Sequence, residues 1–279
     1  MIEVKKAGIL SSLQDRGRFG YRDQGVPLSG AMDQYSAAFA NQLLGNKADR
    51  AVLEFALQGP TLFFNEACKI VICGADWQVE LNGNAIDLNT VIEVPDQSTL
   101  KCKGVKSGIY GYLAVQNGFR EEKVLGSYSY YQGITSKAKI EKGQVLKFRD
   151  SYDTSQQHAS VSFQADLIAA SKLAVTKGPE FDQLNGELME LLFNREFIIS
   201  KDSNRMAYTL NHELELSAEE ITTAPVQPGT VQLTPSGKLV VLMRDAQTTG
   251  GYARILQLTP MGVNQLAQKR PGEKVSFQL

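Results

Sequence analysis

The stretch QVELNGNAIDL (residues 78–88) decides the fold class of this chain. Apolar and polar residues alternate on both sides of the Asn82-Gly83 pair, and a period of two is typical of half-buried strands. Asn-Gly is the strongest short hairpin signal, because both central residues of a type I′ turn take positive φ. The stretch therefore predicts a β-hairpin.

Strand-like alternation recurs through the chain, and helical periodicity is rare. Further strands are expected at 69–73, 98–102, 110–118 and 143–148, and the apolar runs at 238–243 and 254–258 also favour strands. Helical spacing occurs at 32–46, which Asp33 can cap, and at 180–193. Short strands, frequent turns and one long helix in each half favour closed or partly closed β-barrels over a parallel α/β sheet. We expect a mainly β protein with few helices.

A short internal echo suggests two related halves. KGQVLKF (142–148) and PGEKVSF (271–277) both place glycine and polar residues before a short strand that ends in Phe. Between them, residues 150–164 are polar and poor in large aliphatic side chains, as linkers are. We therefore predict a first β-barrel unit at 1–150, a linker at 151–164 and a second β-barrel unit at 165–279.

Composition narrows the classes of function. The chain has 279 residues, 29 Lys plus Arg against 30 Asp plus Glu, and a net charge of −1. This balance argues against nucleic-acid binding and gives no attraction to anionic lipid. No apolar run approaches a membrane helix, and the first residues lack the shape of a signal peptide, so a cytoplasmic protein is expected. Three cysteines and two histidines supply no metal site of ordinary spacing and no well-supported Ser–His or Cys–His nucleophile.

Two polar loops are the candidate functional segments. Residues 12–34 combine several Arg and Asp residues with four glycines, so backbone N–H groups and guanidinium groups can converge on an anion. The alternative is a solvated loop whose charges pair with each other. Residues 245–252, DAQTTGGY, follow an apolar strand, and their Thr hydroxyls and Gly-Gly amides fit either an anion site or a hairpin turn. Glu54 is a lone carboxylate in an apolar segment, either facing solvent or buried with a raised pKa.

Motifs spread over the chain resemble one known family. Their order is similar to that of the biotin-dependent carboxyltransferase-like family, also called the allophanate hydrolase subunit 2 family, from about residue 9 to residue 277. The motifs are LQDRGRFGY, GVPLSGAMD, NQLLGN, LEFALQGPTLFF, ICGAD, YLAVQNGF, VLGSYS, GPEFD, SNRMAYTL and QTTGGY. SGAMD and QTTGGY together form the most specific part of the signature. The chain departs from the family pattern at 223–225, at Ala253 and at 203–207, where a Glu, a Pro and an Asp are replaced.

The resemblance implies two cyclophilin-like β-barrel domains and an enzyme component that works with partners. The family includes the C subunit of 5-oxoprolinase, and the expected activity is ATP-driven opening of 5-oxo-L-proline to L-glutamate. The expected cosubstrate is ATP with Mg²⁺, and no biotin is expected to be attached to this chain. The expected partners are a barrel protein like the B subunit of 5-oxoprolinase, together with its A subunit. The alternatives are a urea-carboxylase or allophanate-type carboxyltransferase half-site and a non-catalytic regulator that binds an inhibitor of a histidine kinase.

The candidate residues follow from this activity. Asp15, Asp33 and Asp245 are expected as catalytic groups that position water or magnesium, since Mg²⁺ favours carboxylate oxygens. Substrate and nucleotide binding is expected from Arg16, Arg18, Tyr21, Ser29, Glu54, Arg205, Gln247, Thr248, Thr249, Gly250, Gly251 and Tyr252. Among these, Arg205 and Glu54 are second-rank candidates. Both loops are predicted to line one pocket at the face that meets the partner.

Overall fold

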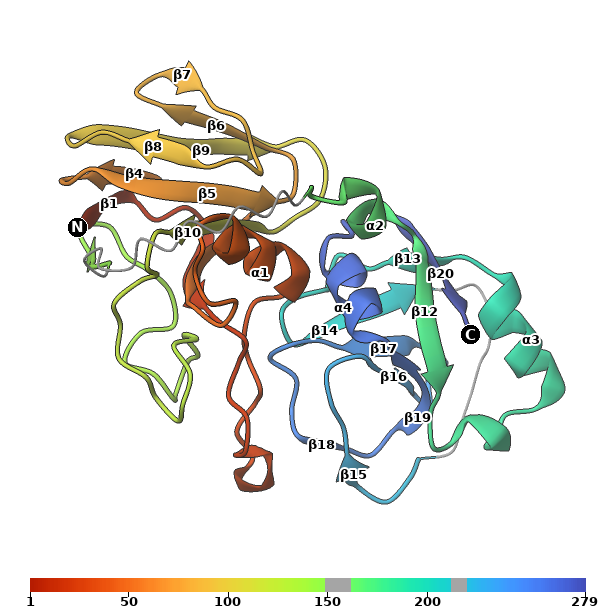
Figure 1. Cartoon of the computed structure of the whole chain (residues 1–279). Helices are drawn as coiled ribbons and strands as arrows, with labels where there is room; N and C mark the ends of the chain where they lie inside the picture. The colour runs from red at the N-terminus through yellow and green to blue at the C-terminus, as the bar shows by residue number, and fades with distance from the viewer. Residues whose placement is uncertain (149–161, 212–219) are drawn as a thin grey trace. The chain divides into compact units, whose positions relative to one another are not determined.

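A computed structural model of the chain describes residues 1–148, 162–211 and 220–279, and these form two compact units. The first unit comprises Met1–Arg18 and Ser29–Gln164, and the second comprises Phe19–Leu28 and Ala165–Leu279 (Figure 1). Residues 19–28 thus group with the second unit, although the sequence placed them in the first. The predicted linker at 151–164 lies mostly outside the described residues.

The first unit is built from two antiparallel sheets (Figure 1). One sheet contains β1 (Ile2–Lys6), β4 (Thr61–Phe64), β6 (Trp77–Leu81), β7 (Asn84–Ala85), β9 (Ser98–Val105) and β11 (Val145–Leu146), in the order β11-β1-β4-β9-β6-β7. The other contains β2 (Leu10–Gln14), β3 (Val52–Ala56), β5 (Cys68–Gly74), β8 (Ile92–Val94) and β10 (Gly111–Val115), in the order β2-β3-β10-β5-β8.

The hairpin that the sequence predicts is formed by β6 and β7. Glu80 pairs with Ala85 and Leu81 with Asn84, which leaves Asn82 and Gly83 as the two turn residues. Their φ values are 51° and 86°, the positive values that a type I′ turn requires. The prediction is confirmed.

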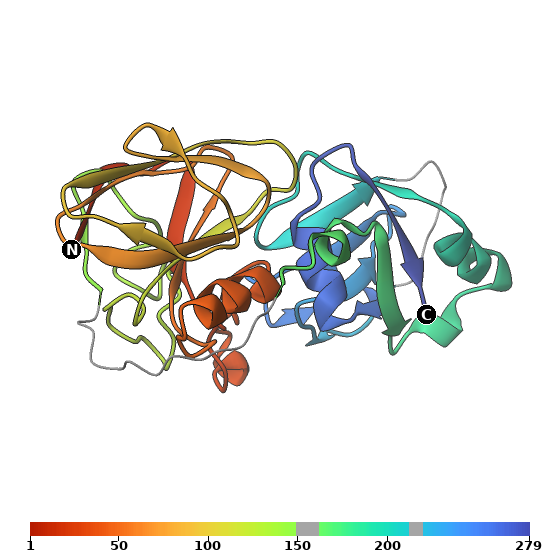
Figure 2. The same ribbon diagram turned by 45° about the horizontal axis from the view of Figure 1, so that its top comes forward.

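The five-stranded sheet is covered on both faces. One face contributes Leu53, Phe55 and Leu113 to the apolar core, in which Phe55 meets Trp77 edge to face at 4.9 Å. Helix α1 (Gln34–Leu43) packs over β5 and β10 (Figure 2). The strands that α1 covers are therefore buried on both faces, and a polar residue on them needs a hydrogen-bond partner.

The helix that the sequence places at 32–46 is α1. Asp33 caps its N-terminus, where the carboxylate accepts hydrogen bonds from the Ser36 N–H at 3.1 Å and the Ser36 hydroxyl at 2.5 Å. The helix ends before Gly45, which has φ 69°. Both predicted boundaries are confirmed to within a few residues.

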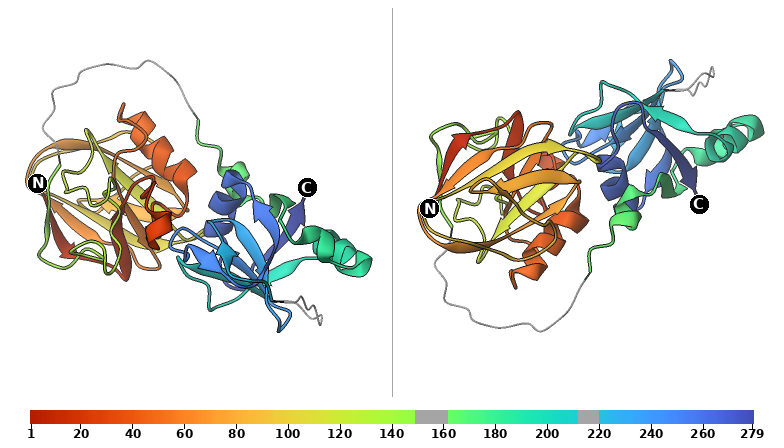
Figure 3. Two further views of the ribbon diagram at one scale, coloured as in Figure 1. Left: turned by 90° about the horizontal axis from the view of Figure 1, so that it is seen from below. Right: turned by 90° about the horizontal axis from the view of Figure 1, so that it is seen from above.

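The second unit is a closed barrel (Figure 3). Its strands are β12 (Lys172–Lys177), β13 (Phe197–Ile199), β14 (Ala207–Asn211), β16 (Thr230–Leu233), β17 (Leu239–Leu242), β19 (Ala253–Leu258) and β20 (Lys274–Gln278). Their order around the barrel is β12-β19-β16-β17-β14-β13-β20, and closure comes from parallel pairing of β12 with β20. A mainly β chain with a barrel is therefore confirmed.

The helices of the second unit differ from the expected single helix at 180–193. A 3₁₀ turn, η2 (Phe181–Gln183), is followed by Leu184 in an extended conformation. Helix α3 (Gly186–Asn194) then begins anew, because the side chain of Asn185 accepts a hydrogen bond from the Leu188 N–H at 2.8 Å. The continuous helix was wrong because apolar spacing does not show where an Asn cap restarts a helix.

Three further short helices were not predicted from the sequence. They are η1 (Arg22–Gln24), α2 (Ala165–Ala169) and α4 (Pro260–Ala267). Helix α4 has a clear start, since Thr259 accepts from the Gly262 N–H at 3.1 Å and Pro260 occupies the first turn. In the described ranges, no helix is long and apolar enough to cross a bilayer.

Candidate functional site

Asp15 anchors a turn of the first unit. Its carboxylate accepts hydrogen bonds from the Gly17 N–H (2.8 Å), the hydroxyls of Ser127 (2.6 Å) and Ser129 (2.7 Å) and the Tyr128 N–H (2.7 Å). The residue is only 9% exposed. A carboxylate with four donors in place is suited to hold the VLGSYS segment (124–129) rather than to take a proton from substrate.

Arg18 holds the same turn from its other side. The guanidinium donates to the carbonyl oxygens of Val124 and Ser129, and the side chain is fully buried. Arg16 lies two residues earlier and is exposed, so its guanidinium is open to a ligand. Tyr21 is partly exposed, and its carbonyl accepts from the N–H groups of Gln24 and Val26 in a turn.

Two acceptors on neighbouring strands fix the SGAMD segment (29–33). Glu54 on β3 accepts from the Met32 N–H at 2.7 Å, and the Tyr112 hydroxyl on β10 accepts from the Asp33 N–H at 2.7 Å. Glu54 is 2% exposed, so it is a buried acid and not a solvent-facing strand residue. Asp33 serves as the helix cap described above, and this engagement leaves its carboxylate bound to protein.

Polar side chains form a row across the five-stranded sheet, and all of them except the half-buried Ser12 are buried. Ser12 lies opposite Glu54, Glu54 opposite Tyr112, and Tyr112 opposite Cys73. Burial, together with the charge of Glu54, raises the pKa of the Tyr112 hydroxyl well above its usual value, so the hydroxyl is neutral at physiological pH. Burial likewise raises the pKa of the Cys73 thiol.

Ser29 has the least common backbone geometry of the segment. Its φ is 57°, in the left-handed region that L residues other than Gly seldom adopt. The residue is fully buried, and its hydroxyl has no hydrogen-bond partner among the described residues. Gly30 follows with φ 92°, and a Cβ there would lie 2.9 Å from the Arg16 carbonyl carbon. The backbone at 29–30 therefore lies so close to the backbone at Arg16 that residue 30 has no room for a side chain.

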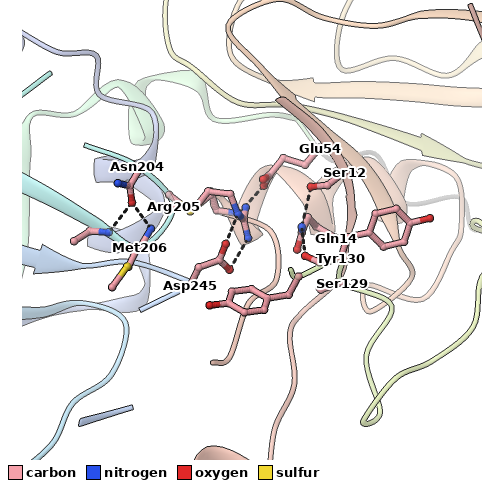
Figure 4. A network of polar contacts seen from close by, with 12 residues as sticks. Ser12, Gln14, Glu54, Ser129, Tyr130, Asn204, Arg205, Met206 and Asp245 are labelled. Atoms are coloured by element: carbon pink, nitrogen blue, oxygen red, sulfur yellow. Dashed lines mark hydrogen bonds and ion pairs between the residues drawn. The ribbon is translucent and has the colours of Figure 1, made fainter. Parts of the chain in front are cut away.

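In the second unit, Asp245 forms a two-point ion pair with Arg205. The carboxylate oxygens accept from Arg205 Nε at 2.7 Å and Nη2 at 3.0 Å (Figure 4). The pair is also joined through the backbone, because the Asp245 N–H donates to the Arg205 carbonyl at 2.9 Å. The side chains are 15% and 18% exposed, so the pair is shielded from most solvent screening.

The side chain of Asn204 folds back onto its own loop. Its Oδ1 accepts from the N–H groups of Met206 and Ala207 at 2.7 and 3.3 Å (Figure 4). This turn precedes β14 and fixes the backbone that carries Arg205. Asn204, where the family pattern led us to expect an Asp, thus has a local structural role.

The QTTGGY segment is one strand of a small two-stranded sheet. Strand β18 (Thr249–Gly250) pairs with β15 (Ala224–Pro225), and the Val226 and Ile221 N–H groups donate to the Thr248 and Gly251 carbonyls. The segment is therefore neither a free anion loop nor a simple hairpin. Thr249 and Tyr252 are exposed, whereas Gln247 Oε1 is buried without a partner in the described chain.

The sequence did not single out two features that the structure makes prominent, an ion pair and a lone arginine. Glu180 and Arg254 form a second two-point ion pair at 2.7 and 2.9 Å, and Glu180 also accepts from the Arg254 N–H. The hydrogen bond from Arg254 lowers the pKa of Glu180. The sequence analysis noted GPEFD only as a family motif. Its Glu180 and Arg254 are far apart in the chain, so only the three-dimensional fold reveals that they pair. The other feature is Arg50, which lines a narrow cleft of the first unit.

Among the described residues, no group of three His, Cys, Asp or Glu side chains could hold a metal ion. The cysteines are free thiols, and burial raises the pKa of Cys68 and Cys102 to about 12. The prediction that loops 14–33 and 245–252 share one pocket stays a prediction.

Comparison with known proteins places this geometry in a family. A family model described as "Carboxyltransferase domain, subdomain A and B" matches residues 24–279. The chain belongs to this carboxyltransferase family. The resemblance that the motifs indicated is thereby confirmed.

Two relatives match over nearly their whole length. A protein from Haemophilus influenzae, named as the C subunit of 5-oxoprolinase, is 30% identical, with 100% of this chain and 91% of that protein covered. A protein of the same name from Escherichia coli is 29% identical, with 99% and 90% covered. Urea amidolyase from Saccharomyces cerevisiae is 27% identical, but the match covers 16% of that protein.

Solved structures show the same fold. The protein TTHA0988 superposes with a TM-score of 0.90 at 30% identity, and this chain spans 55% of it. The urea carboxylase of Kluyveromyces lactis gives a TM-score of 0.85 at 27% identity, with 99% of this chain and 27% of that one covered.

Proposed function

We propose that this chain is the C-type component of an ATP-dependent 5-oxoprolinase that opens 5-oxo-L-proline to L-glutamate. The observation that carries the proposal is the match to two proteins named as the C subunit of 5-oxoprolinase over at least 90% of their length. The proposal includes two partners, a barrel protein of the B type and a component of the A type, and it includes ATP with Mg²⁺ as cosubstrate.

The chemistry needs charge-holding groups more than a protein nucleophile. A lactam is stable to water, so the γ-phosphoryl group of ATP is transferred to its carbonyl oxygen. Water then adds to the carbonyl carbon and the C–N bond breaks, which leaves the free amine and an acyl phosphate. A second water hydrolyses the acyl phosphate to phosphate and the carboxylate of glutamate. Such steps depend on positioned cations and N–H donors.

The free and engaged side chains suggest what this component does. The carboxylates of Asp15, Asp33 and Asp245 already accept hydrogen bonds from protein groups, and binding Mg²⁺ would require them to give these up. The side chains of Arg16 and Thr249 are exposed. We therefore propose that the three carboxylates hold loops in place, and that the exposed side chains of Arg16 and Thr249 contact the substrate.

Reconstitution tests the proposal. The chain is purified in complex with its two partner proteins, and glutamate release from 5-oxo-L-proline is measured with and without ATP. We expect release that requires ATP, lactam and this chain together. ATP-independent release, or equal release when this chain is left out, would contradict the proposal.

A carboxyltransferase half-site is the second candidate. The similarity to the Kluyveromyces lactis urea carboxylase, with a TM-score of 0.85, favours it. In that case the same complex would carboxylate urea with a biotin carrier and would leave 5-oxo-L-proline unchanged. Running both substrates in parallel separates the two functions.

A further inference from the structure

The polar segment 245–254, DAQTTGGYAR, is anchored at both ends by a two-point ion pair. At its start, Asp245 pairs with Arg205, as described above. At its end, Arg254 pairs with Glu180. The two partners belong to two different motifs of the sequence, SNRMAYTL and GPEFD. Both ends of the segment are therefore fixed relative to the barrel of the second unit.

GPEFD holds Arg254 through its backbone as well as through its side chain. The Gly178 N–H donates to the Ile255 carbonyl at 2.9 Å, and the Glu180 N–H donates to the Arg254 carbonyl at 3.3 Å. A Cβ at Gly178 would collide with the Arg254 carbonyl oxygen, so only glycine allows this approach. In return, the Arg254 N–H donates to the Glu180 carboxylate at 2.8 Å. The motif therefore fixes the backbone from which the Arg254 side chain starts.

The guanidinium group of Arg254 binds two different parts of the second unit. Its Nε and Nη2 donate to the Glu180 carboxylate at 2.9 and 2.7 Å, and the remaining nitrogen, Nη1, donates to the Pro225 carbonyl at 3.0 Å. The planar fork of arginine carries five N–H donors in fixed directions, so one group can bridge a carboxylate and a carbonyl. Glu180 thus orients the fork, and the fork holds Pro225.

Pro225 is part of the strand that pairs with the QTTGGY segment. It lies on β15 opposite Thr249 of β18. Proline has no N–H, so its carbonyl is the only backbone group through which it can be hydrogen-bonded, and Arg254 binds that group. The next residue continues the pairing, because the Val226 N–H donates to the Thr248 carbonyl at 3.0 Å. A shift of Pro225 would therefore shift Thr249.

The small sheet needs support from outside. Strands β15 and β18 have two residues each, and an isolated pair of short strands has little stability of its own. Gly250 lies directly on the buried Gln232, since a Cβ at Gly250 would come within 2.7 Å of Gln232 Nε2. The hydrogen bond from Arg254 to Pro225 holds the sheet from the β15 side. The position of the exposed Thr249 side chain therefore depends on these two supports.

The ion pair between Glu180 and Arg254 is largely withdrawn from solvent. Its side chains are 10% and 18% exposed. Removing two charges from water offsets much of the attraction between them, so well-packed apolar residues often stabilise a fold as well as such a pair does. Apolar residues cannot supply a directed donor to the Pro225 carbonyl. The pair is therefore better explained by the geometry it imposes than by stability.

We propose that Glu180 and Arg254 are positioning residues, which hold β15 and β18 so that Thr249 meets the substrate in the correct place. The inference rests on the proposed function, in which Thr249 contacts the substrate. In this arrangement Glu180 and Arg254 do not touch the lactam themselves. Both act through Pro225 and Thr249.

Hydrogen exchange in the purified chain tests whether the pair holds the segment. Arg254→Lys keeps a cation beside Glu180, but a single ammonium group lacks the second edge that reaches Pro225. We expect the Val226 N–H to exchange about tenfold faster than in wild type, while amides of β14 and β17 keep their rates. Glu180→Gln, a milder change, should raise the Val226 rate less. Unchanged Val226 exchange in both variants would overturn the inference, as would an equal increase across the barrel, which would mark a loss of global stability.

A double-mutant cycle in the reconstituted complex tests whether the pair acts through Thr249. Thr249→Ala and Arg254→Lys should each lower kcat/KM for 5-oxo-L-proline about tenfold. The double variant should fall hardly further, because correct placement no longer matters once the hydroxyl is gone. Two effects that multiply would overturn the inference, since Arg254 would then act independently of Thr249.

Glu196→Gln is the matched control. It breaks another ion pair of the second unit, the exposed contact between Glu196 and Lys274 at 2.9 Å. It should leave both the Val226 exchange rate and kcat/KM unchanged. A wild-type complex that releases no glutamate would contradict the proposed function, and the exchange rates of the chain alone would still decide whether Glu180 and Arg254 hold the segment.

Discussion

Replacing Asp15 by Asn tests whether this carboxylate is a structural anchor or a catalytic group. Its Oδ1 accepts three hydrogen bonds, and Oδ2 accepts the fourth from the Tyr128 N–H at 2.7 Å. In Asp15→Asn the amide oxygen can keep the three partners of Oδ1. The amide nitrogen then faces the Tyr128 N–H, so two donors oppose each other and a buried N–H loses its acceptor.

The magnitude follows from these contacts. Hydrogen bonds to a charged group contribute about 1.5–3 kcal/mol each, and an orphaned buried donor costs about 1–3 kcal/mol. Allowing for weakening of the three retained bonds, we expect Asp15→Asn to lower the free energy of unfolding of the first unit by about 2–4 kcal/mol. For a unit of this size the melting temperature falls by about 5–15 °C.

Urea denaturation of the purified chain measures this loss. Ser127→Ala removes only one of the four donors, so it should cost about 1 kcal/mol and serves as the graded comparison. An Asp15→Asn protein with the wild-type unfolding midpoint would refute the reasoning. Loss of glutamate release at that unchanged stability would instead make Asp15 a catalytic group.

Three other predictions concern single contacts. Arg254 lowers the pKa of Glu180 in the folded protein below the pKa of about 4.5 that Glu has in the unfolded chain. The ion pair therefore stabilises the fold fully at pH values above 4.5, and this stabilisation is lost as the pH falls through the folded pKa. The stability difference between wild type and Glu180→Gln, from urea titrations, should therefore be largest near pH 7 and shrink below about pH 4; a difference independent of pH would contradict this. Gly118→Ala should lower the free energy of unfolding by about 1–2 kcal/mol, because φ is positive there and the new Cβ meets the Arg50 stem; an unchanged unfolding midpoint would contradict this. Burial raises the pKa of Cys102 to about 12, so its labelling by a thiol reagent should be slow in native protein and fast in urea.

Local sequence signals predicted the elements whose determinants are close in the chain. The Asn82-Gly83 hairpin and the Asp33 cap need only neighbouring residues, and both lie where the sequence indicated. The helix expected at 180–193 was wrong in extent, since the Asn185 cap competes with continuation and periodicity does not detect it. The assignment of residues 19–28 to the second unit depends on tertiary packing that no local pattern contains.

The sequence indicated residue types for a candidate site, but not the hydrogen-bond partners of those residues. Sequence patterns identified Asp15 and Asp245 as functional carboxylates, and the structure shows the donors that engage each of them. Those donors come from Ser127 to Ser129 and from Arg205, far along the chain, so no spacing rule reveals the pairing. Arg50 was missed for a related reason, because a lone Arg in a loop becomes informative only beside Arg16.

The position of bound 5-oxo-L-proline in a crystal structure of the complex tests the central claim most directly. The account predicts that the bound lactam contacts exposed side chains of this chain, among them Arg16 or Thr249. A lactam bound without any contact to this chain would contradict it.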